Sequence, residues 1–309
     1  MNKTGFIGQY SDKTTYFGRD FMFEGMNRSD TGAPLWHSDL ALERRRADTE
    51  ASGIEYKKEG SGEFTWERIT VSDDEGARSI GRPCGHYDTL TLPRMDTLDE
   101  DGTDDAVNEV AKGLCRIVDR CGIYPDRLLV VGLGNAALTP DSIGPRTAEL
   151  THATMHLKDF DPETFFSMEC SEIAVISPGV TAETGMEAAD VLIGLCDRLQ
   201  PDAVIAVDSL ASGSPTRLGT TVQISDTGII PGGGVGNKRL PLNERVLGIP
   251  VIAIGVPTVI DARIFSHGEG VTAEKSSPSM FVSPREIDTI AASAARIIAG
   301  GINQAFGTV

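Results

Sequence analysis

The chain has 309 residues, of which 40% are hydrophobic and 24% are charged, a composition typical of soluble globular proteins. Its formal net charge of -17 argues against direct binding to nucleic acid or to an anionic membrane, because those polyanions would repel it. Five cysteines, with no C-x-x-C pair among them, indicate neither a zinc cage nor a disulfide framework. The sequence shows no secretory signal and no apolar segment that could span a bilayer, so we expect a cytoplasmic protein.

The first hundred residues lack the strong helical period that follows them. Residues 1 to about 38 show no sustained hydrophobic pattern, and we expect an extension rather than a core element. The alternation in residues 63–71 predicts solvent-facing antiparallel strands or a hairpin. From residue 103 to Cys121 the apolar residues recur at helical spacing, with Thr103 or Asp104 available as the cap.

Strands and helices then alternate along the chain. The predicted strands are 127–133, 171–176, 203–207, 220–224 and 251–254. The predicted helices are 142 to about 152, one that opens with the capping-box spacing Thr184 to Glu187, and one that opens at Ser283 to Glu286. This alternation predicts an α/β fold, a largely parallel sheet covered by helices on both faces, with an N-terminal antiparallel extension.

Aspartates follow the ends of four of the predicted strands. These are Asp141, Asp208, Asp226 and Asp261. The carboxyl ends of parallel strands line the crevice where α/β proteins bind ligands, so we expect such side chains to face a cleft. Two carboxylates held close share a proton, which makes one an acid and the other a base that can activate water without a metal. Asp141 and Asp208 are the leading candidates for an aspartic-type peptidase, although most such aspartates only cap helices or form turns.

Other motifs carry weaker signals. Gly132-Leu-Gly134 matches a relaxed dinucleotide fingerprint, but Pro140 interrupts the helix that should follow, which favours a tight turn carrying Asp141. Residues 225–228 resemble the D-T-G loop of pepsin-like proteases, and we interpret this single loop in an α/β chain as a coincidence. His152 and His156 have metal-ligand spacing without an H-E-x-x-H motif, so we expect no metal and no other cofactor.

A glycine-rich segment runs from residue 231 to residue 239. Its backbone N–H groups could form a nest for an anion or an oxyanion, and a flexible loop is an equally good interpretation. The candidate substrate-binding residues in this segment are Gly232, Gly233, Gly234, Asn237 and Lys238.

Several ordered sequence blocks resemble the germination protease family of endospore-forming bacteria. The blocks are SDLALE at 38–43, VVGLGNAALTPDSIGP at 130–145, AVIAVDSLAS at 203–212, TTVQISDTGIIPGGGVGNKR at 220–239 and GIPVIAIGVPTVIDA at 248–262. The resemblance implies an aspartic peptidase, similar in fold to hydrogenase maturation peptidases, with Asp141 and Asp208 as the catalytic pair. It also implies a zymogen of the sporulating cell that trims its own N-terminus and then degrades the small acid-soluble proteins coating spore DNA.

The same resemblance implies where the chain is cut. The family cleaves substrates after Glu within a Ser/Thr-Glu-apolar-small pattern, and its own leader after Asp in a similar context. Ser38-Asp39-Leu40-Ala41 reproduces this pattern, which implies a leader of residues 1–39 and a peptidase domain of residues 40–309. A homotetramer in the spore core is also implied, and from the net charge we expect no direct nucleic-acid or membrane partner. The alternatives are a nickel-sensing hydrogenase-maturation-type peptidase and a non-catalytic binding protein derived from the family.

Overall fold

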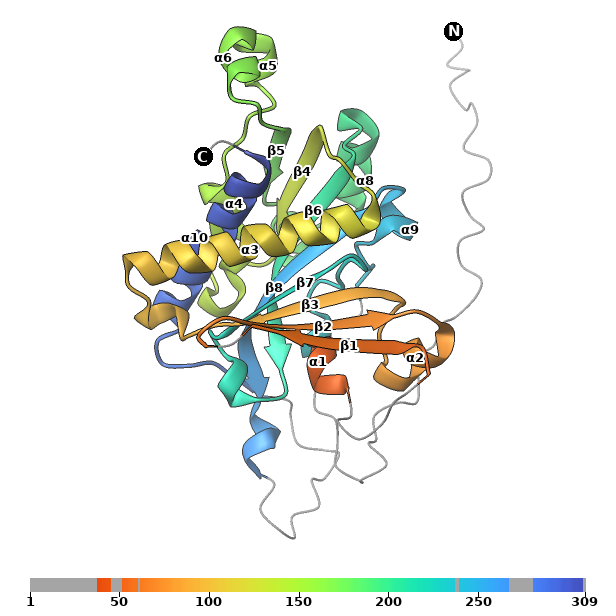
Figure 1. The fold of residues 1–309 in the computed structure, drawn as a ribbon, viewed down its shortest axis with the longest axis vertical. Helices are drawn as coiled ribbons and strands as arrows, with labels where there is room; N and C mark the ends of the chain where they lie inside the picture. Colours follow the sequence, from red (N-terminus) through yellow and green to blue (C-terminus); the bar gives the residue numbers. More distant parts are fainter. Residues whose placement is uncertain (1–37, 46–51, 61, 237–238, 267–279, 308–309) are drawn as a thin grey trace, which may run out of the picture.

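One mixed sheet organises the molecule in the computed structural model, which describes residues 38–45, 52–60, 62–236, 239–266 and 280–307 (Figure 1). Its strand order is β1-β2-β3-β7-β8-β6-β4-β5, and β9 pairs with β8. The strands are β1 (Ile54–Glu59), β2 (Thr65–Val71), β3 (Gly85–Thr91), β4 (Arg127–Gly132), β5 (Glu172–Ile176), β6 (Ala203–Ser212), β7 (Thr221–Ser225), β8 (Val251–Asp261) and β9 (Phe281–Val282). The neighbours β5, β4, β6 and β8 are parallel, and every other pairing is antiparallel. This confirms the α/β class with a parallel core and an N-terminal antiparallel extension.

Helices cover both faces of this sheet. In the described part of the chain they are α1 (Ala41–Arg44), α2 (Asp74–Ile80), α3 (Glu100–Cys121), α4 (Ile143–Leu150), α5 (Leu157–Phe160), α6 (Pro162–Ser167), α7 (Thr181–Thr184), α8 (Ala188–Leu199), α9 (Glu244–Leu247) and α10 (Ile287–Phe306). Along β4, Leu128 and Val130 join a core with α3 and α10, while Leu129 and Val131 join one with α8 and α9. This alternation is what a strand buried on both faces requires. No helix in the described residues is long and apolar enough to cross a membrane.

A third, smaller core lies beneath the antiparallel strands. It contains Ile69 and Val71 of β2, Tyr87 of β3, Ala41 of α1 and Ile80 of α2. These helices therefore pack on the same face of the sheet as α8 and α9, but over its other end. The sheet surface between the two helix pairs, over β6, β8 and β7, holds the site described below.

Most predicted elements are confirmed, but three helix starts were wrong. The N-cap of α3 is Asp99, whose side chain accepts a hydrogen bond from the Gly102 amide, so Thr103 and Asp104 lie inside the helix. Thr184 ends α7 and takes no part in capping α8, which begins after Glu187 without a side-chain cap. These ends depend on local turn geometry that hydrophobic spacing does not record.

The last helix also begins later than predicted. Pro284 lies in a turn whose carbonyl accepts a hydrogen bond from the Ile287 amide, and α10 begins at Ile287, three residues beyond the expected start. Glu286 is its N-cap and makes no side-chain capping bond. The expected cap at Ser283 was therefore wrong.

Three of the strand-end aspartates are placed differently from the prediction. β6 extends to Ser212, so Asp208 lies inside a strand rather than after its end, and β8 extends to Asp261, which is its last residue. β7 runs antiparallel to β8, so Asp226, which follows β7, lies at the opposite edge of the sheet from the carboxyl ends of the parallel strands. The hydrophobic pattern of a strand does not predict whether it runs parallel or antiparallel to its neighbour. The expectation that Asp226 lies at the same edge of the sheet as Asp141 was wrong for that reason.

Candidate active site

Asp208 is a buried carboxyl group in the middle of the parallel sheet. Its side chain is 3% exposed, and its Oδ1 accepts a hydrogen bond from the Ser209 amide at 2.8 Å. In the register of the sheet Asp208 lies opposite Gly255 of β8, and Gly255 lies opposite Gln223 of β7. Residues aligned across neighbouring strands point to the same face, so Asp208 and Gln223 share the face that carries α8 and α1.

Asp141 reaches the site through a tight turn after β4, as predicted. Its Oδ2 accepts a hydrogen bond from the Asn135 amide at 2.8 Å, which closes the turn. Gly134 has φ +114, and a Cβ there would lie 2.1 Å from the Asp141 carbonyl oxygen, so a larger residue would open the turn. A Cβ at Gly132 would lie 2.1 Å from the Gly144 carbonyl oxygen, which shows how closely α4 packs on the strand.

One cavity of about 380 Å³ brings these carboxyl groups together. Its wall includes Asp141, Asp208 and Asp39, together with Gly232 and Gly234 of the glycine-rich segment. The structure therefore places both predicted catalytic aspartates and the acidic residue of the predicted cut site around one space.

The cavity raises the pKa of two of its carboxyl groups, Asp208 and Asp141. Burial raises the pKa of Asp208 well above its usual range, and the negative charges of Asp141 and Asp39 raise it further, against hydrogen bonds from the Ser209 and Gly232 amides. Burial also raises the pKa of Asp141, opposed by the Asn135 amide and the charge of Arg239. Of the two, Asp208 keeps its proton to the higher pH, because burial and the charges of Asp141 and Asp39 all favour its protonated form.

The segment that contains the predicted cut is part of the fold. The Asp39 amide donates to the Ala211 carbonyl at 2.8 Å, and the Ala211 amide donates to Asp39 Oδ2 at 2.8 Å. A Cβ on Gly234 would lie only 1.9 Å from the same Oδ2, so the glycine leaves the space that the carboxylate fills. Leu40 and Ala41, which follow, are fully buried. Thus Gly234 contacts the Asp39 side chain, while Gly232 contacts Asp208.

Polar residues that the sequence analysis missed fix the same segment. Gln223 donates from Nε2 to the Asp39 carbonyl at 3.3 Å and accepts at Oε1 from the Ala41 amide at 2.8 Å. Glu43 accepts from the Ser38 hydroxyl, from Ser212 Oγ at 2.7 Å and from the Gly213 amide at 2.6 Å. Glu43 lies within the SDLALE block and Gln223 within the block at 220–239, so both had the signal of the family resemblance, although the strand pattern alone does not distinguish Gln223 from an ordinary strand residue.

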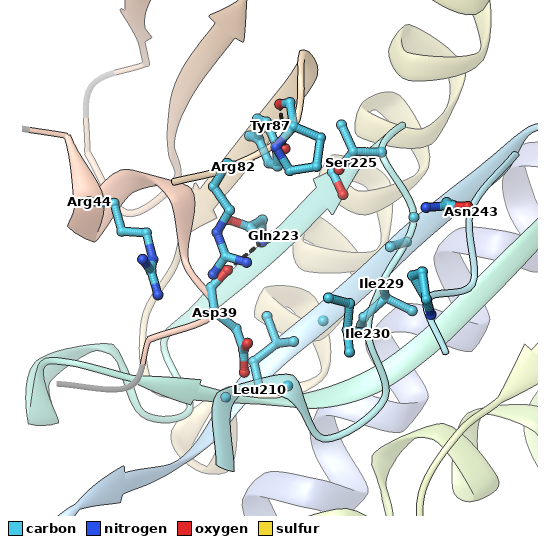
Figure 2. A pocket seen from close by; sticks show the side chains of 18 of the residues that line it. Asp39, Arg44, Arg82, Tyr87, Leu210, Gln223, Ser225, Ile229, Ile230 and Asn243 are labelled. Atoms are coloured by element: carbon cyan, nitrogen blue, oxygen red, sulfur yellow. Dashed lines mark hydrogen bonds between the residues drawn. The ribbon is translucent and has the colours of Figure 1, made fainter. Parts of the chain in front are cut away.

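A second, larger cavity of about 530 Å³ adjoins the segment on the other side of Asp39 (Figure 2). Arg44 and Arg82 project from its wall, and both donate to the Ser38 carbonyl, Arg82 Nη2 at 2.7 Å and Arg44 Nη2 at 3.1 Å. Burial and the neighbouring charge of Arg82 lower the pKa of Arg44 to about 10. Figure 2 shows the side chain of Gln223 beside Asp39, in the wall of this larger cavity.

The remaining candidates lie elsewhere or outside the described residues. Asp226 accepts hydrogen bonds from the His86 amide at 2.7 Å and contacts His86 Nδ1 at 2.6 Å, and it lines neither cavity. Asp261 is buried against Arg263. Asn237 and Lys238 lie outside the residues that the structure describes.

The two histidines with metal-ligand spacing do not share a helix. His152 follows the end of α4, and His156 precedes α5. Among the described residues, no group of three or more His, Cys, Asp or Glu side chains is arranged to hold a metal ion.

The buried carboxyl group of Asp208 and the half-buried one of Asp141, around a cavity that Asp39 also lines, define a candidate hydrolase site of the peptidase class. Comparison with known proteins gives the family. The family model described as germination protease matches residues 36–268. A germination protease of Caldanaerobacter subterraneus subsp. tengcongensis is 37% identical, covering 87% of this chain and 93% of the relative. Those of Clostridium perfringens (34%; 86% of this chain, 93% of the relative) and Bacillus licheniformis (42%; 73% and 63%) are also similar.

The chain therefore belongs to the germination protease family, and it is a protease of spore germination. A solved [NiFe] hydrogenase maturation protease, HycI from Thermococcus kodakarensis KOD1, aligns with a TM-score of 0.35 and 20% identity, covering 62% of this chain and 99% of that one. That similarity is too distant to support a conclusion about this chain.

Proposed function

We propose that the protein is an aspartic-type endopeptidase, made as a zymogen that cuts its own chain between Asp39 and Leu40. The mature enzyme then cleaves small acid-soluble spore proteins after an acidic residue, in the cytoplasm of the spore. The observation that carries this proposal is that Asp39 lines the same cavity as Asp141 and Asp208, with its backbone bonded to β6.

In the proposed mechanism the two aspartates divide the work of acid and base. Asp141 is ionised and takes a proton from a water molecule, whose oxygen forms a bond to the Asp39 carbonyl carbon. Asp208 holds the shared proton, as the direction of its pKa supports, and gives it to the leaving nitrogen of Leu40 when the carbon–nitrogen bond breaks. The reaction consumes one water and needs no metal.

The surroundings of each residue in the segment match the chemistry of the proposed substrates. The carboxylate of Asp39 binds the Ala211 amide beside Gly234, which suits an acidic residue before the cut. Leu40 is fully enclosed, which suits an apolar residue, and Ala41 has no exposed surface into which a longer side chain could extend. Ser38 donates to Glu43, which suits a hydroxyl-bearing residue. After the leader leaves, the Ser/Thr-Glu part of a spore protein would occupy the places of Ser38 and Asp39. Its apolar and small residues would take the places of Leu40 and Ala41 only if the new N-terminus moves out of them.

Self-processing of the full chain tests the cut site and the aspartate pair together. After incubation at mildly acidic pH, N-terminal sequencing should find a new terminus at Leu40, formed at a rate independent of protein concentration if the cut is intramolecular. Asp141→Asn and Asp208→Asn should each abolish the cut. Asp226→Asn is the matched control, because it removes a strand-end carboxylate outside both cavities, and it should process at the wild-type rate. Substantial processing by either active-site variant would remove that residue from the mechanism.

Digestion of a purified small acid-soluble spore protein tests the substrate. Mass spectrometry should find fragments that end in Glu, and activity should survive strong chelators. Loss of activity to a chelator, restored by one added metal, would instead support a metal-dependent peptidase. An absence of fragments from a fully processed enzyme would refute the substrate assignment.

A further inference from the structure

The side-chain amide of Gln223 spans the peptide bond that is proposed to be cut. Its Nε2 lies 3.3 Å from the carbonyl oxygen of Asp39, and its Oε1 lies 2.8 Å from the amide nitrogen of Ala41. The carbonyl of Asp39 and the amide of Leu40 form the scissile bond. Gln223 thus bonds to one group directly on this bond and to one group one residue beyond it.

The two partners determine the orientation of the Gln223 amide. A backbone carbonyl only accepts hydrogen bonds and a backbone N–H only donates them. The NH₂ group must therefore face Asp39 and the oxygen must face Ala41. Gln223 is 8% exposed, so the N–H that faces the carbonyl acts in a site with little water, where such a bond is stronger than in solution.

The position of Gln223 in the sheet places this donor across from the acid. Gln223 and Asp208 lie on either side of Gly255 in one row of the sheet and point to the same face. Strands are about 4.8 Å apart, so the two backbone positions are separated by roughly 10 Å. Gly255, between them, has no side chain, and the side chain of Leu210 fills that place, 2.4 Å from where a Cβ on Gly255 would lie.

We infer that Gln223 is a catalytic residue whose Nε2–H stabilises the oxyanion formed at the Asp39 carbonyl. This inference rests on the proposed cut between Asp39 and Leu40. As the water oxygen bonds to the carbonyl carbon, the electron pair of the C=O π bond moves to the oxygen, and the negative charge develops where Nε2–H points. When the C=O bond re-forms, the carbon–nitrogen bond breaks and the nitrogen takes the proton from Asp208. The donor to the oxyanion is then the side chain of Gln223 in β7 rather than the backbone of the glycine-rich segment.

The removal of this donor tests the inference. Gln223→Met keeps the length of the side chain and loses both hydrogen bonds, and it should lower the first-order rate of self-processing by roughly 10²- to 10³-fold, the usual effect of losing an oxyanion donor. Gln304→Met, on the exposed side of α10, is the matched control and should process at the wild-type rate. A Gln223→Met protein that processes within about threefold of the wild type would overturn the inference.

Gln223→Glu provides a second test that depends on charge rather than on folding. An ionised Glu has no donor for the Asp39 carbonyl, whereas a protonated Glu has one O–H to donate and one oxygen to accept from Ala41, as the amide does. The processing rate of Gln223→Glu, divided by that of the wild type at the same pH, should therefore rise as the pH falls. A ratio that stays flat across the pH range would overturn the inference, even if Gln223→Met fails to fold.

The kinetics of the processed enzyme separate catalysis from simple anchoring. Prolonged incubation should convert enough Gln223→Met chain to measure the cleavage of a peptide containing Ser-Glu-Leu-Ala. A lost oxyanion donor lowers kcat and leaves KM nearly unchanged, whereas a lost anchoring contact raises KM alone and would overturn the assignment. Failure of the proposed function would be visible separately. In that case the wild type would cut elsewhere, or Asp141→Asn and Asp208→Asn would remain active.

Discussion

Gly234 offers a direct test of how the Asp39 side chain is held. A Cβ at this position would lie 1.9 Å from Asp39 Oδ2 and 2.7 Å from the Ala211 Cβ. The first distance is about 1.6 Å shorter than an ordinary non-bonded contact of about 3.5 Å. The backbone of Gly234 is not in the left-handed region, so the strain in an alanine variant would come from these contacts alone: the Asp39 carboxylate must move, and the Ala211 Cβ must give way by a few tenths of an ångström.

Gly234→Ala should therefore slow self-processing without unfolding the protein. A shift of this size breaks the 2.8 Å hydrogen bond from the Ala211 amide to the carboxylate. A hydrogen bond to a charged group is worth roughly 1.5–3 kcal/mol. If that free energy is lost in the transition state, the rate falls roughly 10- to 150-fold.

The assay is the single-turnover appearance of the Leu40 terminus, followed by mass spectrometry of the full chain. Gly194→Ala is the matched control, because a Cβ on that glycine in α8 has no neighbour within 4 Å. It should leave the rate unchanged and raise the free energy of unfolding by roughly 0.5–1 kcal/mol. Processing of Gly234→Ala within about threefold of the wild type would show that the carboxylate is not held at this glycine during the reaction.

Three further predictions concern the acid, the adjacent hydroxyl and the scaffold. The folded protein raises the pKa of Asp208 and so binds its proton more tightly than the unfolded chain does, which means that Asp208 lowers the stability of the fold once the pH rises above the usual pKa of an aspartate. Asp208→Asn should therefore raise the melting temperature at neutral pH and leave it unchanged in acid. A gain in melting temperature that stays constant with pH would contradict this. Ser38→Ala removes the acceptor of the Leu40 amide and the donor to Glu43, and should slow processing roughly 10-fold, whereas Ser38→Thr should retain the rate. Asp88 is fully buried and forms ion pairs with Arg116 at 2.9 Å and Arg120 at 2.8 Å. Asp88→Ala should therefore lower the free energy of unfolding, measured by urea denaturation, by roughly 3–5 kcal/mol, and a loss below about 1 kcal/mol would refute this prediction.

The elements that the sequence predicts well are those with a local cause. The apolar residues of α3 recur at helical spacing within one segment, and β4 is a continuous apolar run before a glycine turn, so both could be placed from neighbouring residues alone. The turn that carries Asp141 is local in the same sense, since its closing bond joins residues six apart. The two aspartates could be paired in advance because both belong to the parallel part of the sheet.

The features that sequence could not predict depend on partners far along the chain. The bond from Gln223 to the Asp39 carbonyl joins residues 184 positions apart, and within β7 Gln223 is one polar residue between Val222 and Ile224. The wrong prediction for Asp226 has the same cause, a partner far along the chain. Only the pairing of β7 with β8 shows that β7 is antiparallel to its neighbour. A pattern of residues records which side chains are buried, and not which distant backbone they meet.

The charge of the substrate itself enters the proposed chemistry. Asp39 raises the pKa of Asp208, as Asp141 does, so a bound acidic residue helps to keep the acid protonated at the moment when a proton must be given to the leaving nitrogen. A neutral residue in that place would lose the Ala211 contact to its carboxylate and would also let the pKa of Asp208 fall. When the leader leaves, Asp208 loses that influence until the acidic residue of a substrate replaces it. Under this mechanism an acidic residue before the cut has two effects: its carboxylate binds the Ala211 amide, and its charge helps to keep Asp208 protonated.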